Sequence, residues 1–280
     1  MKVTKMHGLG NNYIYISLFE EQLDEVELAP LAVELSDVRK GIGSDGMILI
    51  GPSDKADVRM RIFNADGSEA ENCGNGLRCV AKYAVEHGYV GSDSLHIETK
   101  ASVVEAFAHR NDAGVVDRVT VDMGELDYGP AAVGYTGESV DNTAKLTVGG
   151  TDYTGHLVSV GNPHFVCFVD DAVSMPVAEI GPHIERHFDF PNRVNVEFVT
   201  PRGRDELDFR VWERGSGITY ACGTGACASV AAGVSHGLLS GRVLVHLLGG
   251  DLEIEVKDGR VWMTGEAVTV FTGEYNRRKG

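Results

Sequence analysis

The sequence predicts an α+β fold made of two similar domains, and three observations support this prediction. Short runs of β-branched and aromatic residues, bounded by Gly, Asp or Pro, recur along the whole chain and are typical of strands. Only a few segments have the apolar spacing of helices. Two stretches of the chain also match one another at a nearly constant offset, which indicates an internal duplication. Many strands with few helices favour α+β.

The predicted strands fall into two groups. Those in the first three quarters of the chain are separated by longer loops and helices, and they lie at 47–50, 58–63, 95–99, 119–123, 165–169, 195–199 and 209–212. The C-terminal group is expected to form a meander, because Gly-Gly, Asp-Gly and Thr-Gly pairs separate its strands. These strands lie at 243–248, 252–256, 261–263 and 267–271.

Four helices are predicted. Apolar residues recur at a spacing of three and four between Leu77 and Val85, and Gly88 ends the pattern, so we expect a helix over 75–87. The segment 225–234 is small and apolar on every side. A helix without a polar face is buried, so we expect this one inside a sheet or barrel. Two further helices are predicted at 28–35 and 176–187.

The duplication is clearest around two Cys-Gly-x-Gly motifs. An offset of 149 residues places Cys73-Gly74-Asn75-Gly76 on Cys222-Gly223-Thr224-Gly225, and 61–65 on 210–214. An offset of 151 residues places Gly10-Asn11 on Gly161-Asn162, and Ser44 on Asn195. Three blocks in the same order at similar offsets predict two related domains, 1–121 and 122–267.

The charge balance excludes several classes of function. The 280 residues include 25 basic and 41 acidic side chains, which give a formal net charge of −16 at pH 7. Such a chain repels phosphate backbones and anionic lipids, so we expect neither nucleic acid nor a membrane as a partner. No apolar run approaches the ~18 residues of a membrane span, and residues 1–20 lack the pattern of a signal peptide. We expect a soluble, cytoplasmic protein.

The five cysteines do not predict a disulfide framework or a metal site. Their number is odd, no CxxC pair is present, and the histidines are scattered away from them. Three of them lie within predicted helices or apolar strands and are interpreted as small buried packing residues: Cys79, Cys167 and Cys227.

Cys73 and Cys222 differ because each directly precedes a predicted helix and is followed by glycine. A thiol at this position faces unpaired N–H groups and the positive end of the helix dipole, which favour the thiolate. The glycines allow those N–H groups to converge on an anion such as a carboxylate. We therefore interpret both cysteines as reactive groups that take part in the chemistry of the protein and not as packing residues.

The symmetry of the two motifs suggests a reaction. Two domains related by a pseudo-twofold axis would bring the thiols to opposite sides of one interdomain cleft. With an α-amino acid bound between the helix N-termini, one thiolate removes the α-proton and the opposite thiol delivers a proton to the other face. The helix ends would stabilise charge on the substrate carboxylate. The product is the other stereoisomer, and we expect no cofactor.

Polar residues near these motifs suggest a substrate with a second amino-carboxylate end. Arg214 lies in a glycine-rich loop, where its guanidinium can bind a carboxylate through two hydrogen bonds. Glu213 is a candidate to hold an ammonium group, and His164 is a candidate to tune the nearby thiol. Four asparagines lie at strand ends on the same expected cleft: Asn11, Asn64, Asn162 and Asn195.

The cysteine and asparagine motifs together resemble those of the diaminopimelate epimerase family. The run Asn64-x-Asp66-Gly67-Ser68, followed by Cys73-Gly74-Asn75-Gly76-x-Arg78, matches the family signature without a substitution. Further matches follow in the family's order: His7-Gly8-x-Gly10-Asn11, Gly161-Asn162-Pro163-His164, Arg193-Val194-Asn195-Val196-Glu197, Trp212-Glu213-Arg214-Gly215 and Ala221-Cys222-Gly223-Thr224-Gly225.

The resemblance implies cofactor-independent interconversion of LL- and meso-2,6-diaminopimelate, in lysine and peptidoglycan synthesis. It implies that Cys73 and Cys222 are the catalytic pair, assisted by His164 and Glu213. It also implies that each domain wraps a sheet around a central helix, and that the last strand, about 268–280, returns to the first domain. The implied substrate-binding residues are Asn11, Asn64, Gly74, Asn75, Asn162, Asn195, Glu213, Arg214, Gly223 and Thr224.

The sequence departs from the family pattern at two positions. Ser44 stands where many members have glutamine, so no substrate contact is assigned to it. Phe271 takes the place of a tyrosine that many members use in dimer formation. A homodimer is therefore possible, and the sequence does not decide it.

Two other functions remain open from the residues. A proline or hydroxyproline racemase would share the fold and the paired cysteines, but its ring substrate has no use for Arg214 and the asparagines. A redox-responsive binding protein would instead join Cys73 and Cys222 in a reversible disulfide. The racemase is distinguished by its substrate, and the binding protein by the absence of turnover when fully reduced.

Overall fold

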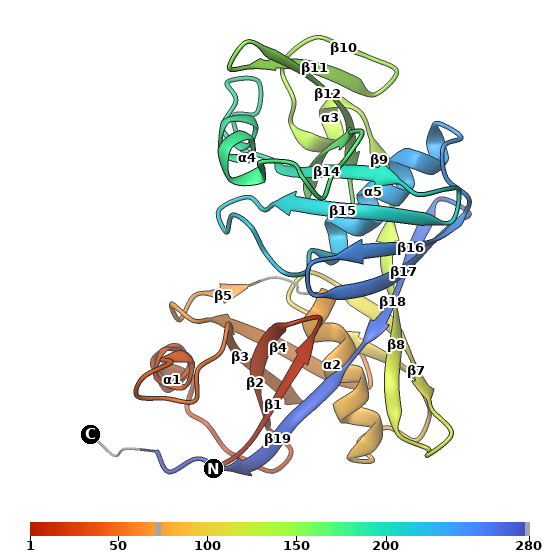
Figure 1. The fold of residues 1–280 in the computed structure, drawn as a ribbon. Helices are drawn as coiled ribbons and strands as arrows, with labels where there is room; N and C mark the ends of the chain where they lie inside the picture. Colours follow the sequence, from red (N-terminus) through yellow and green to blue (C-terminus); the bar gives the residue numbers. More distant parts are fainter. Residues whose placement is uncertain (71–73, 278–280) are drawn as a thin grey trace. The chain divides into compact units, whose positions relative to one another are not determined.

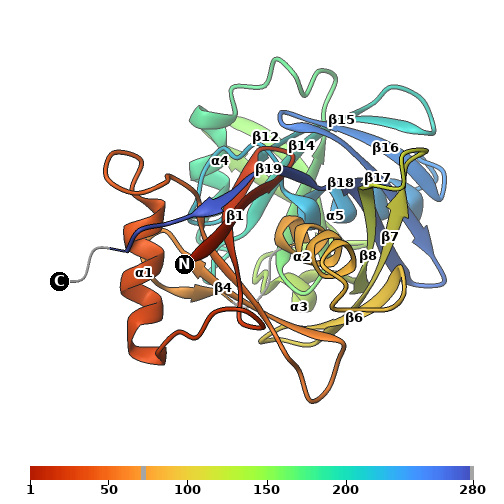
Figure 2. The ribbon, with the colours of Figure 1, turned by 90° about the horizontal axis from the view of Figure 1, so that it is seen from below.

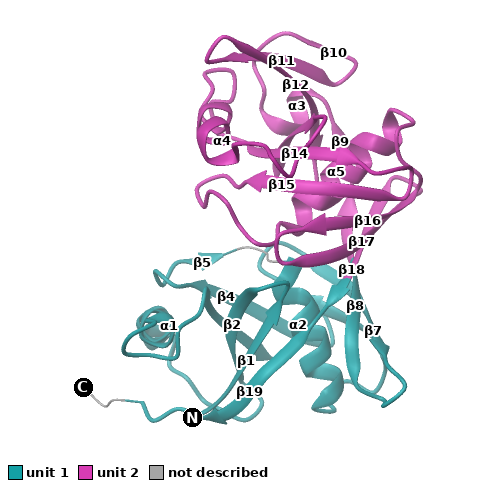
Figure 3. Ribbon diagram, viewed as in Figure 1, with its two compact units in different colours: residues 1–121, 265–280 teal, residues 122–264 magenta. Residues whose placement is uncertain are grey.

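The computed structural model describes residues 1–70 and 74–277 and divides into two compact units (Figure 3). Unit 1 contains residues 1–121 and 265–280, and unit 2 contains residues 122–264. The chain passes between the units twice, within strand β8 (Val116–Glu125) and within strand β18 (Arg260–Glu266).

Unit 1 is a mixed sheet with two α-helices (Figure 1). Its strand order is β19–β1–β2–β3–β4–β6–β7–β8, with β2–β3 and β4–β6 parallel and the other neighbours antiparallel. The short β5 (Glu69–Ala70) pairs with β4. The remaining elements are β1 (Lys2–Gly8), β2 (Asn11–Ser17), the 3-10 turn η1 (Glu25–Glu27), α1 (Leu28–Ser36), β3 (Gly46–Gly51), β4 (Val58–Asn64), α2 (Gly74–Glu86), β6 (Ser94–Glu98), β7 (Val103–Arg110) and β19 (Val268–Glu274).

Unit 2 is a second mixed sheet, with the order β10–β11–β12–β13–β14–β15–β16–β17–β18. Its parallel pairs are β13–β14 and β15–β16, and β9 pairs with β12. The elements are β9 (Asp127–Tyr128), α3 (Pro130–Val133), β10 (Ser139–Val140), β11 (Thr143–Val148), β12 (Thr151–Ser159), β13 (Pro163–Phe168), α4 (Val177–Glu185), β14 (Asn195–Pro201), β15 (Glu206–Trp212), α5 (Gly223–Ser235), β16 (Arg242–Leu247) and β17 (Gly250–Lys257).

The two units repeat one connectivity. In each unit the first parallel pair is joined through a short helix, which is α1 between β2 and β3 and α4 between β13 and β14. The second parallel pair is joined through α2 in unit 1 and α5 in unit 2. The helix α5 begins and ends 149 residues after α2, the offset at which the Cys-Gly-x-Gly motifs match. The internal sequence match therefore corresponds to a repeated supersecondary unit, as an α+β chain with a duplication predicts.

Each of these two helices is the buried element of its unit. Figure 2 shows α2 with β1, β6 and β7 around it, and nearly all of its residues are buried. The helix α5 contacts β12, β13, β14 and β17, and its run Gly225–Gly233 is buried without a break. A Cβ on Gly233 would lie 2.4 Å from Leu239 Cδ1, so the helix packs closely against this side chain. The prediction that 225–234 is a buried helix is confirmed.

The other predicted helices are confirmed with small shifts of their ends, and all predicted strands are present. The sequence did not predict β1, β5, β7, β9, β10, β11, β12 or the short α3. The residues of β11 (TAKLTV) and β12 (TDYTGHLVS) mix strand-forming residues with lysine, aspartate and glycine. Their extended conformation comes from pairing with each other and with β13, because strand propensity depends on neighbouring strands more than on composition.

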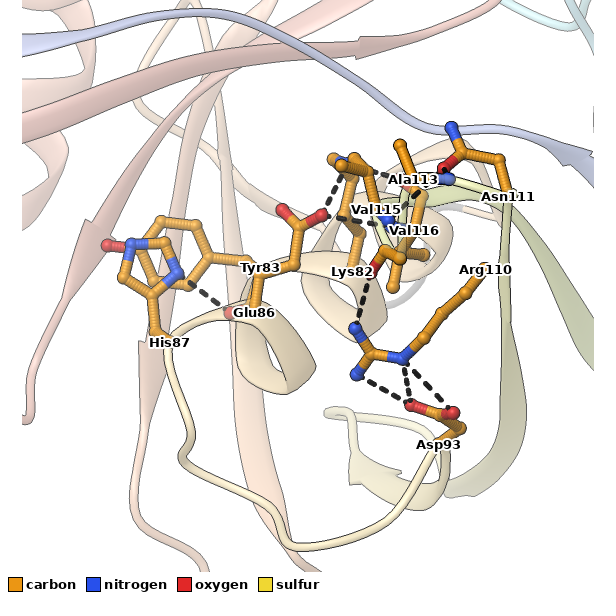
Figure 4. A network of polar contacts seen from close by, with 11 residues as sticks. Lys82, Tyr83, Glu86, His87, Asp93, Arg110, Asn111, Ala113, Val115 and Val116 are labelled. Atoms are coloured by element: carbon orange, nitrogen blue, oxygen red, sulfur yellow. Dashed lines mark hydrogen bonds and ion pairs between the residues drawn. The ribbon is translucent and has the colours of Figure 1, made fainter.

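A buried lysine attaches α2 to the start of β8 (Figure 4). The Lys82 side chain is 6% exposed, and its Nζ lies 2.9 Å from Glu86 Oε1 and donates a hydrogen bond to the Val116 carbonyl. The same Glu86 oxygen accepts a hydrogen bond of 3.1 Å from the Val116 N–H. The lysine and the glutamate therefore satisfy both backbone groups of Val116 and hold the second half of the helix against the sheet.

We expect Lys82→Met to lower the free energy of unfolding by about 2 kcal/mol, because it leaves a carboxylate and a buried carbonyl without their donor. Chemical denaturation followed by circular dichroism measures this. The control is Arg110→Met, which breaks the exposed ion pair with Asp93, 2.8 Å long, and should cost clearly less. Equal losses in the two variants would contradict a special role for the buried lysine.

Candidate active site

The part of the candidate site in unit 1 is built at the N-terminus of α2. Cys73, which precedes the first helical residue Gly74, lies outside the described residues. Asn75 is buried in the first turn, and its Nδ2 donates to Asn11 Oδ1 over 3.4 Å. Asn11 in turn donates to Asp45 Oδ2 over 3.0 Å. The predicted residues Asn11 and Asn75 are therefore neighbours at the helix end.

Arg78 supports this group from inside the unit. It is 0% exposed, it donates to Asn75 Oδ1 over 2.9 Å, and its Nε donates to the Glu266 carbonyl over 3.1 Å. A Cβ on Gly8 would lie 2.6 Å from the guanidinium, so the first strand packs directly against it. The sequence assigned no role to Arg78. One sequence feature could have identified it: Arg78 lies among apolar residues inside a predicted helix, five residues after Cys73.

Asn64 lies at the C-terminal end of β4, in a tight turn of its own. Its Nδ2 donates to Ser68 Oγ over 3.0 Å, and Ser68 also donates to Asp66 Oδ1. Gly67 has a φ of +85°, in the left-handed region that glycine adopts without strain. The turn explains the Asn-x-Asp-Gly-Ser run structurally and fixes the place of the Asn64 amide.

The part of the candidate site in unit 2 is built at the N-terminus of α5. Cys222 is the N-cap residue, with extended backbone angles, and its side chain is buried. Its Sγ lies 3.8 Å from Thr224 Oγ1. A Cβ on Gly225 would lie 3.1 Å from that sulfur and 2.8 Å from Glu197 Oε1, while a Cβ on Gly223 would lie 2.7 Å from Met263 Sδ. Gly225 therefore packs closely against the thiol and the Glu197 carboxyl, and Gly223 packs against Met263.

Hydrogen bonds at the helix end favour the Cys222 thiolate, as the sequence predicts, but burial of the sulfur outweighs them. The pKa of Cys222 is raised well above its usual value, chiefly because burial disfavours the charged form. The carboxyl groups of Glu213 and Glu197 raise the pKa further, and hydrogen bonds with Gly225 and Thr224 oppose them only in part. Cys222 is accordingly a protonated thiol at neutral pH.

Glu213 lies beside this thiol, at the end of β15. Its carboxyl accepts a hydrogen bond from Thr219 and makes another with Cys222. Burial raises the pKa of Glu213 above its usual value, although both hydrogen bonds act in the other direction. Its backbone N–H and carbonyl pair with Gly217 over 2.7 and 2.9 Å, which closes a tight loop. The structure thus places the predicted pair of Glu213 and Cys222 in contact.

His164 occupies the centre of a buried polar chain. Its Nδ1 lies 2.7 Å from Glu197 Oε1, and its Nε2 lies 2.9 Å from Asn162 Oδ1. The Nδ2 of Asn162 donates to Thr224 Oγ1 over 3.2 Å, and that hydroxyl faces Cys222. His164 and Glu197 are both 0% exposed. Three predicted residues, His164, Asn162 and Thr224, are therefore joined in sequence to the thiol.

Asn195 and Arg214 are also in contact. Asn195 is buried at the start of β14, accepts a hydrogen bond of 2.8 Å from the Arg214 N–H, and donates one of 3.0 Å to the Pro163 carbonyl. The Arg214 side chain is exposed, and its guanidinium donates to the Asn192 carbonyl over 3.3 Å. Asn195 is thus used to position the backbone of the arginine, and the guanidinium stays accessible.

The predictions about the other cysteines are confirmed. Cys79, Cys167 and Cys227 are each at most 1% exposed within their helix or strand. Burial and the nearby Glu197 carboxyl raise the pKa of the Cys167 thiol, so this group stays protonated.

Within residues 1–70 and 74–277, no group of three or more His, Cys, Asp and Glu side chains is arranged to hold a metal ion. None of the helices in the described part of the chain is long and apolar enough to cross a membrane.

Comparisons with known proteins agree with the geometry. The sequence model of the family "Diaminopimelate epimerase" matches residues 3–128 and 156–270. The diaminopimelate epimerase of Geobacillus kaustophilus is 53% identical over 99% of this chain and 97% of its own. That of Bacillus subtilis is 52% identical over 98% of both chains.

A solved hydroxyproline epimerase from Agrobacterium vitis has the same fold, with a TM-score of 0.66, 18% identity and coverage of 98% of this chain and 91% of its own. At this identity the likeness concerns the fold alone. Sequence relatives above 50% identity over nearly the whole length decide the family, and the chain belongs to the diaminopimelate epimerase family.

Proposed function

We propose that the chain interconverts LL- and meso-2,6-diaminopimelate without a cofactor, by transfer of a proton to and from the α-carbon between Cys73 and Cys222. The observation that carries the proposal is the buried Cys222 at the N-cap of α5, hydrogen-bonded to Glu213. The family membership supports diaminopimelate, a small molecule of lysine and peptidoglycan synthesis, as the substrate.

In the proposed reaction, the substrate carboxylate at the reacting end binds at the helix N-termini. Gly74 and Asn75 of α2, and Gly223 and Thr224 of α5, supply the N–H groups and polar side chains. These donors stabilise the charge that moves onto the carboxylate as the α-proton leaves. The same donors stabilise that charge in either direction of the reaction.

The proton balance requires one thiolate and one thiol. In the direction in which Cys222 is the acid, the Cys73 thiolate takes the α-proton, and the Cys222 thiol gives its proton to the opposite face of the carbanion. The enzyme is left with a Cys73 thiol and a Cys222 thiolate, which is the starting state for the reverse reaction. Glu213 and His164 assist by holding the groups around the sulfur.

The far end of the substrate carries a second carboxylate and ammonium group, which require charged and polar partners. We assign the carboxylate to Arg214, whose accessible guanidinium suits two-point binding. Asn11, Asn64, Asn162 and Asn195 supply amide groups, Asn195 partly by holding the Arg214 backbone. Glu213 remains the proposed partner of an ammonium group.

We also propose a cytoplasmic location and a homodimer. The exposed apolar side chains of Val270 and Phe271 on β19 support a self-association surface in unit 1. Light scattering coupled to size-exclusion chromatography tests the assembly state.

We expect Cys222→Ala, and equally Cys73→Ala, to lower epimerase turnover at least about a hundredfold, because each removes one of the two proton-transfer groups. Deuterium incorporation at the α-carbon of diaminopimelate in heavy water, measured by mass spectrometry, checks this. Cys167→Ala is the matched control, a buried thiol to which we assign no proton transfer. Turnover above a tenth of the unsubstituted level in Cys222→Ala would contradict the mechanism.

The same exchange experiment separates the proposed function from a racemase. Proline and hydroxyproline should show no exchange when diaminopimelate exchanges readily. Exchange of proline alone would overturn the substrate assignment, and no exchange of any amino acid by the fully reduced protein would favour a binding protein.

We expect Arg214→Ala to raise KM for diaminopimelate about tenfold, because a charge-assisted contact with the distal carboxylate is lost. Arg214→Lys should restore only part of it, since lysine lacks the two-point geometry. Steady-state kinetics gives both values, and Arg193→Ala, an exposed arginine of the same unit, is the control. An unchanged KM in Arg214→Ala would remove the arginine from the substrate site.

A further inference from the structure

Glu197 is a buried carboxyl group to which the proposed mechanism assigns no role. It lies in β14 and is 0% exposed, and its Oε1 is 2.7 Å from the Nδ1 of the equally buried His164. Its other oxygen, Oε2, is buried without a hydrogen-bond partner among the residues that the structure describes. An ionised carboxylate with a bare oxygen in such a place is costly, so its protonation state needs an explanation.

The hydrogen bonds around His164 limit where its protons are. The Asn162 amide places Nδ2 toward the Thr224 hydroxyl, so its Oδ1 faces the histidine Nε2 over 2.9 Å. An amide oxygen only accepts hydrogen bonds, and therefore Nε2 carries a hydrogen. One further proton is left for the contact between Nδ1 and Glu197 Oε1. This proton lies either on the carboxyl group or on the ring.

The two choices differ in their charge distribution. With the proton on the ring, an imidazolium faces a carboxylate. With the proton on Glu197, both groups are neutral and the carboxyl O–H donates to Nδ1. The net charge is the same, but only the first choice places a negative charge beside the Gly225 backbone, which the Cys222 sulfur also contacts. That charge would oppose a thiolate on Cys222 in the proposed reaction.

We propose that Glu197 is a positioning residue that works as a neutral acid: its carboxyl group donates to His164 Nδ1 and thereby holds Asn162 and Thr224 in the orientation that faces Cys222. It fixes the Nε2–H tautomer of the ring, and it keeps a second negative charge away from the sulfur. The expected effect of Glu197 on turnover rests on the proposed function, whereas its protonation state does not.

The surroundings of Glu197 support the neutral form. The titratable groups that face it are His164 and Cys167 of β13, Glu213 after β15 and Cys222 of α5. Of these, only the histidine can favour a carboxylate. Burial raises the pKa of Glu197 above its usual value in spite of the histidine.

Two substitutions of the same size separate a neutral donor from a carboxylate. In Glu197→Gln, the amide N–H replaces the carboxyl O–H toward Nδ1, so kcat should fall by no more than about threefold. In Glu197→Met the donor is absent, so kcat should fall at least about tenfold with a smaller change in KM. If Gln is as harmful as Met, Glu197 acts as a carboxylate and the proposal is wrong. Equal activity of all three proteins would also overturn it.

Nitrogen-15 NMR of the histidine rings gives a reading that does not depend on turnover. The His164 signals are assigned by their loss in His164→Asn. We expect Nε2 protonated and Nδ1 unprotonated at neutral pH, in the unsubstituted protein and in Glu197→Gln. A doubly protonated ring in the unsubstituted protein would overturn the proposal, and this holds even if Glu197→Met fails to fold.

The matched control is Glu185, another buried glutamate of unit 2, which accepts hydrogen bonds from Trp212 Nε1 and the Gly215 N–H. Glu185→Gln should lower the melting temperature and leave the His164 tautomer unchanged. A change of that tautomer in Glu185→Gln would show that the protonation of His164 responds to any loss of stability and not specifically to Glu197. If the unsubstituted protein fails to epimerise diaminopimelate, the proposed function fails, while the NMR result still decides the state of Glu197.

Discussion

The structure depends on the burial of polar groups at the first turn of a central helix in each unit. Such a helix end supplies N–H groups without internal partners, and these must find acceptors or a ligand. In unit 2 the thiol of Cys222 and the carboxyl groups of Glu213 and Glu197 are gathered there. Burial of the Cys222 sulfur outweighs the hydrogen bonds that would favour its thiolate, so the thiol stays protonated.

Glycine makes this burial possible. Gly225 allows the Cys222 sulfur and the Glu197 carboxyl to contact one face of the helix, and Gly8 allows β1 to lie against the Arg78 guanidinium. A side chain at either position would push the backbone away from the polar group that it covers. Gly225 and Gly8 thus have a packing cause at the site.

The two units share a connectivity and differ in the charge around the helix end. In unit 1 the buried group beside the first turn of α2 is a guanidinium, Arg78. In unit 2 the position 149 residues later is Cys227, a packing residue, and the neighbours of the first turn of α5 are carboxyl groups. A duplicated fold therefore carries unlike electrostatic environments at the two corresponding helix ends.

The sequence by itself determined the α+β class, the duplication, the two central helices and the family, because these follow from local spacing and motifs. It also identified His164, Asn162, Thr224, Glu213 and Cys222 as one group. Only the tertiary structure decided that the Cys222 thiol is protonated, that Asn195 serves the Arg214 backbone, and that Glu197 faces His164. These features depend on burial and on contacts between strands distant in sequence, and no local pattern encodes the desolvation that results.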